Sequence, residues 1–341
     1  MKKLMIGLML VMLVMSSLSA CGPPAEEATS PNKIVSFPDS NFEARIRTYI
    51  DKPEGPIYID DLEKLTLLNA NDFEISDLRG IEHCRNLKKL FIYDNNISDI
   101  SPLASLTKLV YLYLNRNNLS DISPLKNMAN LTYLTLHNNK IRDISPLSSL
   151  GSLKMLNLSR NLIDDVSPLS SLNNLHSLYL RENQLTDISP LASLNNLSTL
   201  DLRGNQIADI TPLASLSKLN TLDLGNNQIS DIPPLSGLEK MWALDLEENL
   251  IIDISSLSSL KNIQVLHLEK NQIIDVSALA NLKLLTRLYL SENQIADIKP
   301  LIENRGIGHH TEIELEGNPL SEESLNVYIP QLEERGVEVK W

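Results

Sequence analysis

Residues 109–130 read LVYLYLNRNNLSDISPLKNMAN, and this pattern of 22 residues recurs in register along the middle of the chain. Each unit follows the template Leu-x-x-Leu-x-Leu-x-x-Asn-x-Ile-x-Asp-Ile-x-Pro-Leu-x-x-Leu-x-x, in which the first Leu is position one. Ten consecutive units without an insertion predict a single repeat array. Their first residues are Leu87, Leu109, Leu131, Leu153, Leu175, Leu197, Leu219, Met241, Ile263 and Leu285.

The spacing within a unit predicts two local structures. Leu at positions four and six, with an outward residue between them, alternates like a short strand with one buried face. Stacked units would align these strands in a parallel sheet at about 4.8 Å spacing, so that ten units span roughly 48 Å. Ser101-Pro102-Leu103 and its counterparts predict a helical turn, with Ser as the cap and Pro at the first helical position. Ser256 and Ala278 replace this Pro, and we expect their turns to persist.

Two polar positions occur in all ten units. The Asp at position thirteen (Asp99 in the first unit) is expected to cap a turn rather than to bind a ligand. The Asn at position nine lies where the chain leaves the strand, so its amide can pair with backbone groups that the turn leaves unsatisfied. We therefore predict a ladder of Asn95, Asn117, Asn139, Asn161, Asn183, Asn205, Asn227, Asn249, Asn271 and Asn293.

The array has an atypical unit at each end. A degenerate unit begins at Leu65 and places Cys84 at a core position, where we expect a buried free thiol. The last unit ends at Asn318, 25 residues after Asn293, and therefore holds three extra residues. His309-His310 falls in this expansion and is expected to lie in a surface loop. The repeats thus cover residues 65–318.

End repeats need caps, because a stack otherwise ends in an exposed apolar slab. A helix is predicted to open at Ser40, with Glu43 completing the capping box, inside an amino-terminal cap at 36–64. A second helix is predicted over 321–335, made irregular by Pro330, inside a carboxyl-terminal cap at 319–341.

The amino terminus predicts export. Lys2 and Lys3 precede an apolar run that is too short to span a bilayer, and Leu18-Ser19-Ala20-Cys21 resembles a bacterial lipobox. We predict a lipoprotein signal peptide at 1–20, lipidation of Cys21 and a flexible tether over 21–35. An ordinary secretory signal is the alternative. The expected location is the cell envelope or cell surface, with the lipid as the membrane anchor.

Composition and motifs narrow the function. The 341 residues carry a net charge of −13, which argues against nucleic acid as a partner because phosphate binding needs a basic face. The six His are scattered, and the chain has no Gly-rich phosphate loop, nucleophile elbow or Cys/His metal spacing. We therefore expect neither an enzyme nor a cofactor or metal site.

The 22-residue unit resembles the internalin-type leucine-rich repeat of bacteria over residues 65–318. This resemblance implies an α/β solenoid shaped as an arc or horseshoe, with a parallel β-sheet on the concave face and short helical or 3-10 turns on the convex side. It also implies a protein-recognition role for the repeats. The sequence ends at Trp341 without the immunoglobulin-like segment or wall-sorting signal of well-known members, so we expect a lipoprotein variant.

Aromatic residues gather on the predicted concave face, at positions three, five and seven. The register makes Tyr111 and Tyr133 neighbours, and likewise Phe91 and Tyr113. An exposed aromatic cluster on a rigid sheet is a candidate binding surface, although aromatics also simply suit strands. The candidate ligand-binding residues are Phe91, Tyr93, Tyr111, Tyr113, Tyr133 and Tyr179.

Farther along the same face, position five becomes acidic. Asp201 is expected to have Arg181 and Arg203 close by, whereas later carboxylates are expected to face one another. A basic partner or a divalent cation would relieve this repulsion, and simple solvation is the alternative. The candidate acidic patch consists of Asp223, Asp245, Glu247 and Glu269.

The leading functional hypothesis is a non-enzymatic, envelope-tethered module that binds an unidentified partner protein through its concave face. The alternatives are binding of a carbohydrate or cell-wall polymer through the tyrosines, and a passive structural spacer.

Overall fold

The computed structural model describes residues 33–341. The predicted signal peptide, Cys21 and most of the tether lie outside the described residues, so these remain predictions. Within 33–341, no helix combines the length and the apolar character that crossing a membrane would require.

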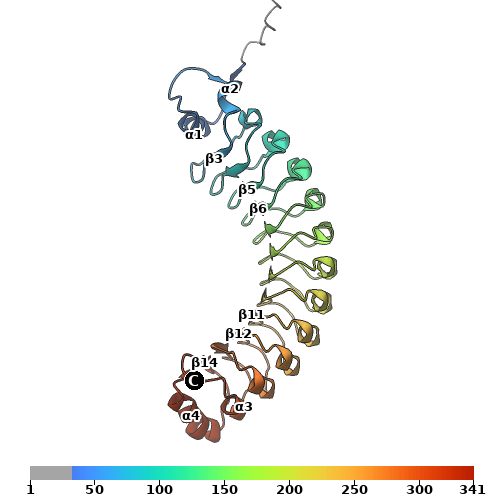
Figure 1. Ribbon diagram of the computed structural model, residues 1–341, viewed down its shortest axis with the longest axis vertical. Helices are drawn as coiled ribbons and strands as arrows, with labels where there is room; N and C mark the ends of the chain where they lie inside the picture. The colour runs from blue at the N-terminus through green and yellow to red at the C-terminus, as the bar shows by residue number, and fades with distance from the viewer. Residues whose placement is uncertain (1–32) are drawn as a thin grey trace, which may run out of the picture.

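The described chain forms an arc whose inner face is one parallel sheet (Figure 1). Thirteen strands follow one another in sequence order, which confirms the predicted solenoid. They are β3 (Leu67–Asn69), β4 (Lys89–Phe91), β5 (Tyr111–Tyr113), β6 (Tyr133–Thr135), β7 (Met155–Asn157), β8 (Ser177–Tyr179), β9 (Thr199–Asp201), β10 (Thr221–Asp223), β11 (Ala243–Asp245), β12 (Val265–His267), β13 (Arg287–Tyr289), β14 (Glu312–Glu314) and β15 (Glu338–Lys340).

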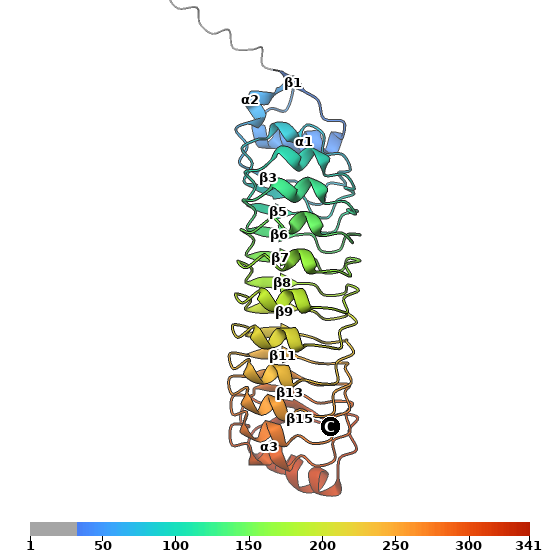
Figure 2. The ribbon, with the colours of Figure 1, turned by 90° about the vertical axis from the view of Figure 1, so that its right-hand side faces the viewer.

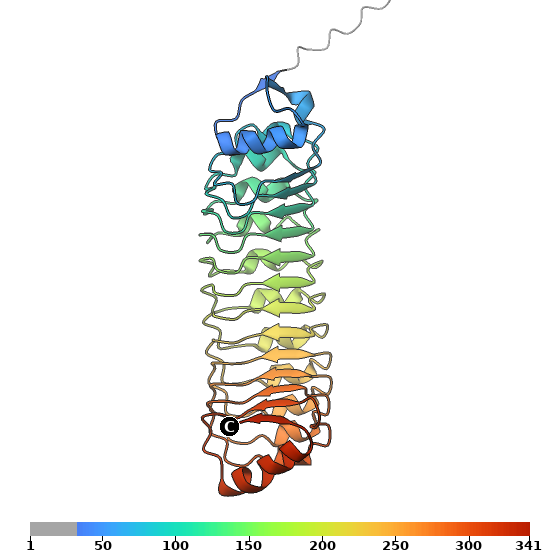
Figure 3. The same ribbon diagram turned by 90° about the vertical axis from the view of Figure 1, so that its left-hand side faces the viewer.

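Equivalent positions of successive units pair across the sheet, as Leu200 does with Leu222. Figure 3 shows these short strands side by side. From β3 to β14 the middle residue of each strand is buried, whereas the residues on either side of it, apart from Thr135, remain at least partly exposed. Buried apolar side chains form one continuous cluster from Val35 to Val337. The outward residues therefore stand on a sheet that is supported along its whole length.

Short 3-10 turns cover the convex side (Figure 2). They are η1 (Ile81–His83), η2 (Ser101–Ser105), η3 (Ser123–Asn127), η4 (Ser145–Leu147), η5 (Ser167–Leu169), η6 (Ser189–Ser193), η7 (Thr211–Ser215), η8 (Pro233–Gly237), η9 (Ser255–Ser259) and η10 (Ser277–Asn281). The last two contain Ser256 and Ala278, which confirms that these turns persist without Pro.

The cap of these turns differs from the prediction. Asp99, not Ser101, supplies the acceptor: its Oδ1 accepts the Ser101 N–H at 2.8 Å, and the Ser101 hydroxyl donates to Oδ2 at 3.0 Å. Serine is therefore a donor here, because both its backbone N–H and its hydroxyl are directed to the Asp99 carboxylate. The turn-capping role predicted for the position-thirteen Asp is thus observed.

The position-nine Asn residues link each unit to the one before. Asn183 shows the pattern: its Oδ1 accepts the Ile163 N–H at 3.1 Å, and its Nδ2 donates to the carbonyls of Leu158 at 3.1 Å and Leu180 at 3.0 Å. Asn318 continues the ladder through the Ile295 N–H at 3.0 Å, despite the three extra residues before it. The residue preceding each of the ten regular Asn has a left-handed φ, between +52° and +68°.

The amino-terminal cap contains α1 (Ser40–Ile50), α2 (Ile59–Leu62) and an antiparallel pair, β1 (Ile34–Val35) and β2 (Ile57–Tyr58). The cap residue of α1 is Asp39 rather than Ser40, because Asp39 Oδ1 accepts the Phe42 N–H at 2.9 Å. Its Oδ2 accepts the Ser76 N–H at 2.8 Å. One carboxylate thus fastens the cap helix to the first repeat.

The carboxyl-terminal end contains α3 (Lys299–Glu303), a π-helical segment η11 (Ser324–Tyr328) and α4 (Ile329–Glu334). The predicted irregularity is present, since the wide turn of η11 ends just before Pro330. The added strand β15 was not predicted. It pairs with β14 and covers the edge of the sheet.

Candidate functional site on the concave face

Four of the candidate aromatic residues form one cluster on β4, β5 and β6. The rings of Tyr111 and Tyr133 stack at 4.8 Å with an interplanar angle of 2°. Phe91 and Tyr113 meet edge to face at 5.0 Å and 79°. Lys89 Nζ lies 5.1 Å from the centre of the Tyr111 ring. We call Phe91, Tyr111, Tyr113 and Tyr133 the aromatic cluster.

The other two candidates stand apart from the aromatic cluster. Tyr93 follows β4, and within the described residues its ring stacks on no other aromatic ring. Tyr179 lies on β8, separated from the cluster by β7, and its register neighbours are Asn157 and Asp201. All six candidates are half-buried. The structure thus brings together four of the six.

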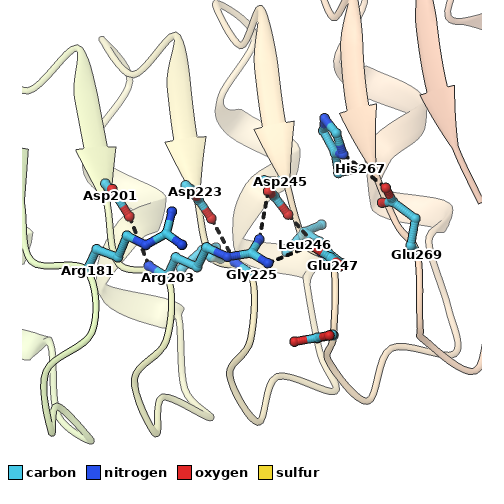
Figure 4. A network of polar contacts seen from close by, with 12 residues as sticks. Arg181, Asp201, Arg203, Asp223, Gly225, Asp245, Leu246, Glu247, His267 and Glu269 are labelled. Atoms are coloured by element: carbon cyan, nitrogen blue, oxygen red, sulfur yellow. Dashed lines mark hydrogen bonds and ion pairs between the residues drawn. The ribbon is translucent and has the colours of Figure 1, made fainter.

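Three aspartates form a row on β9, β10 and β11 (Figure 4). Asp201, Asp223 and Asp245 are register partners across the sheet. Each Oδ1 accepts a backbone N–H two residues later, at 3.1, 3.0 and 2.9 Å respectively. We call these three residues the aspartate row.

Arg203 follows β9, and its side chain passes β10 to reach acidic residues two units farther along the chain. Its Nη1 lies 3.1 Å from Asp245 Oδ2, and its Nη2 lies 2.6 Å from Glu247 Oε2. Gly225 leaves room for this crossing, because a Cβ there would lie 2.3 Å from Arg203 Nη1. Together with the side chains of Asp245 and Glu247, Arg203 therefore bridges two strand spacings, roughly 10 Å.

This arrangement confirms the predicted neighbours of Asp201 and corrects those of Asp245. The sequence predicts Arg181 and Arg203 beside Asp201 and no cation beside Asp245. Burial raises the pKa of Asp201, and the charges of both arginines oppose that rise, so both do lie near it. In the structure, Arg203 pairs with Asp245 and Glu247, and Arg181 Nε instead pairs with Glu182 at 3.0 Å. Within residues 33–341, Asp201 and Asp223 have no ion-pair partner within 4 Å. Burial, and then the Asp245 charge, raises the pKa of Asp223 to about 6.

The rest of the candidate acidic patch is also paired. His267 follows Asp245 in register, stacks on Tyr289 at 4.4 Å, and places Nδ1 3.1 Å from Glu269 Oε1. Burial alone would lower the pKa of His267, but the nearby Glu269 raises it above its ordinary value. Lys270 Nζ lies 3.4 Å from Glu247 Oε1. The patch is therefore a network of both charges rather than a bare acidic surface.

Reactive groups are scarce in the described part of the chain. Residues 33–341 contain no group of three or more His, Cys, Asp or Glu placed to hold a metal ion. The predicted buried thiol is confirmed at Cys84, where burial raises the pKa to about 12. A thiol with this pKa stays protonated and is a poor nucleophile at neutral pH.

Comparison with known proteins identifies the repeat. The family described as Leucine Rich repeats (2 copies) matches residues 85–127, 107–149, 129–171, 151–194, 173–215, 195–237 and 261–303. An internalin from Listeria monocytogenes is 33% identical, with 89% of this chain and 95% of that chain covered and a TM-score of 0.77. This chain is an internalin-like leucine-rich repeat protein.

Two further solved structures resemble this internalin-like chain. Internalin C2 of Listeria monocytogenes is 37% identical, covers 67% of this chain and 94% of its own, and has a TM-score of 0.54. A leucine-rich repeat protein of Leptospira interrogans is 25% identical, covers 77% and 74%, and has a TM-score of 0.64. No curated protein sequence matches the chain.

Proposed function

We propose that this internalin-like chain is a non-enzymatic recognition module that binds a partner protein through its concave face. Leucine-rich repeat proteins generally act in protein recognition. The observation that carries the proposal is the aromatic cluster, in which Tyr111 and Tyr133 stack on neighbouring strands. Tyrosines that are already ordered lose little entropy on binding and are frequent centres of binding energy.

The cluster also has the polar edges that an interface needs. Burial raises the pKa of Tyr113, so its hydroxyl stays protonated and can donate to a partner. Lys89 lies beside the Tyr111 ring, and the mixed network around Arg203 begins three strands beyond β6. We propose that the partner covers the aromatic cluster with apolar surface and meets charged groups toward β9. Such an apolar centre with a polar border is the usual anatomy of a protein interface.

Replacing Tyr93, Tyr111, Tyr113 and Tyr133 together with Ala is expected to weaken capture of the partner by about a hundredfold or more. The tagged full-length chain and the variant would each be crosslinked in envelope and culture fractions, and the captured proteins compared. Tyr289→Ala is the matched control, because it removes a concave tyrosine on β13, beyond both the cluster and β9. A partner protein recovered equally by the quadruple variant would contradict the proposal, provided that both chains unfold at the same temperature. Loss of a glycan instead of a protein would also contradict it.

We further propose that the module is attached to the cell envelope through a lipid on Cys21. The support is the lipobox-like sequence at 18–21. Cys21→Ser is expected to move most of the protein from the membrane fraction to the soluble or secreted fraction, because a lipid anchor supplies nearly all the membrane affinity. Cys84→Ala is the control and should stay with the membranes, since this thiol is buried in the core. Membrane retention of the Cys21 variant would refute the anchor.

A further inference from the structure

A pocket of about 640 Å³ lies where the last strands of the sheet begin. Arg287, Glu312 and Glu338 are the first residues of β13, β14 and β15, and the register places them side by side. All three line the pocket. It is separate from the aromatic cluster, which lies on β4 to β6.

Trp242 supplies an aromatic wall of this pocket. It lies one residue before β11, where its backbone N–H donates to the Asn220 carbonyl at 2.8 Å. The indole remains 46% exposed, although Trp is a residue that proteins usually bury. It is one of only two tryptophans in the sequence. Because the backbone of Trp242 is held by a hydrogen bond and its indole is exposed, the indole face is available for a ligand to stack on.

The three extra residues of the last unit supply the opposite part of the lining. His309 and His310 belong to this expanded loop, and their rings lie 3.9 Å apart. The loop depends on glycine: a Cβ at Gly306 would lie 2.1 Å from the Lys283 carbonyl oxygen. A Cβ at Gly336 would lie 2.9 Å from His309 Nδ1. The sequence thus departs from its regular repeat at the place where the pocket forms.

The pocket offers hydrogen-bonding groups that the protein itself leaves unused. Within the described residues, the side chains of Arg287, Glu338, His309 and His310 have no hydrogen-bond or ion-pair partner. Glu312 shares Lys340 with Glu314, because the Lys340 Nζ lies 2.9 Å from Glu312 Oε1 and 2.6 Å from Glu314 Oε1. Among the charged side chains that line the pocket, the Arg287 guanidinium and the Glu338 carboxylate therefore remain available to a ligand. A neutral ligand with both donors and acceptors fits this set better than an ion of either sign.

We propose that this pocket binds a neutral sugar unit of a glycan. An indole surface suits the C–H face of a sugar ring, since Trp combines a large apolar face with a polar edge. Hydroxyl groups donate and accept, so the same ring can accept from Arg287 and donate to Glu338. The volume lies within the range of small-molecule sites. This glycan site is independent of the protein-binding role proposed for the aromatic cluster.

The test uses the full-length chain in detergent with Trp341→Phe, so that Trp242 is the one remaining tryptophan and can be excited selectively at long wavelength. Neutral trisaccharides of glucose, N-acetylglucosamine, galactose and mannose are titrated while Trp242 emission is followed. We expect a saturable change with at least one of them, with half-saturation below about 10 mM. Arg287→Met should weaken that binding at least tenfold. Calorimetry with Trp242→Ala should show the same loss.

Two controls separate this site from the protein-binding surface. The Tyr93/Tyr111/Tyr113/Tyr133→Ala variant should bind the trisaccharide normally, and so should His176→Ala, which lies outside the pocket. Absence of a saturable change with all four sugars would overturn the proposal. So would binding that Arg287→Met and Trp242→Ala leave unchanged, or saturation by trilysine or triglutamate in place of the sugars.

Discussion

Asn183→Ala is expected to lower the free energy of unfolding by about 3–4 kcal/mol. The Asn183 carboxamide accepts the hydrogen bond of the buried Ile163 N–H, so its removal leaves a backbone donor in the core without an acceptor. The carbonyls of Leu158 and Leu180 keep a second donor each, from Asn161 and Asn205, and lose only part of their hydrogen bonding. An unsatisfied buried donor costs about 1–3 kcal/mol, and each lost hydrogen bond adds about 1 kcal/mol.

The measurement is equilibrium unfolding in urea followed by circular dichroism. Asn174→Ala, at the end of the preceding unit, is the matched control, because its exposed side chain donates one hydrogen bond, to the Gly151 carbonyl at 2.7 Å. This control should change the free energy of unfolding by less than about 1 kcal/mol. An equal loss in both variants would mean that the ladder adds nothing beyond an ordinary surface hydrogen bond.

The ladder and the strands follow from sequence because they depend on local spacing. A unit of 22 residues stacks on its copy, so Leu and Asn at fixed positions meet their own equivalents. The same rule predicts that Tyr111 lies beside Tyr133 and Phe91 beside Tyr113, as the structure shows. Periodicity therefore fixes which residues are neighbours on adjacent strands.

The features that the sequence did not predict depend on a long side chain that contacts a non-adjacent strand, or on backbone that does not follow the repeat. The pairing of Arg203 with Asp245 skips a strand, and its only sequence signal is the missing side chain at Gly225. Buried Asn304 donates to the carbonyls of Leu279 and Leu282 inside the expanded loop, where no repeat template applies. Strand β15 follows a helix and pairs in the sheet only because β14 leaves an open edge. None of these contacts is encoded by a recurring spacing.

Arg203 is the residue on which the charge balance of the aspartate row depends. Only 19% of its side chain is exposed, and the carboxylates of Asp245 and Glu247 that it contacts are 21% and 22% exposed. Carboxylates at this depth are poorly solvated, so removing their cation leaves them repelling one another. Arg203→Met keeps much of the apolar stem and removes the charge. Near pH 7.5, the unfolding free energy of this variant should be lower by about 2–3 kcal/mol. This loss is smaller than the loss on breaking a fully buried ion pair, because these side chains are partly solvated.

The pH dependence tests whether the loss is electrostatic. In the natural chain, burial already raises the pKa of Asp223 to about 6 and raises that of Asp245. Without Arg203, the folded-state pKa values of both residues should rise further above their unfolded values. A raised carboxyl pKa means that the folded state binds more protons than the unfolded state, so stability increases as the pH falls through that range. The deficit of the variant should therefore shrink to about 1 kcal/mol near pH 4.5.

Arg181→Met is the matched control, because its partner Glu182 is 43% exposed and Arg181 itself is 40% exposed. It should change the unfolding free energy by less than about 1 kcal/mol at either pH. A second control, Asp245→Asn in the Arg203→Met background, should recover part of the loss near pH 7.5 by removing one of the repelling charges. A deficit of equal size at both pH values would show instead that Arg203 stabilises the fold through packing of its stem across Gly225.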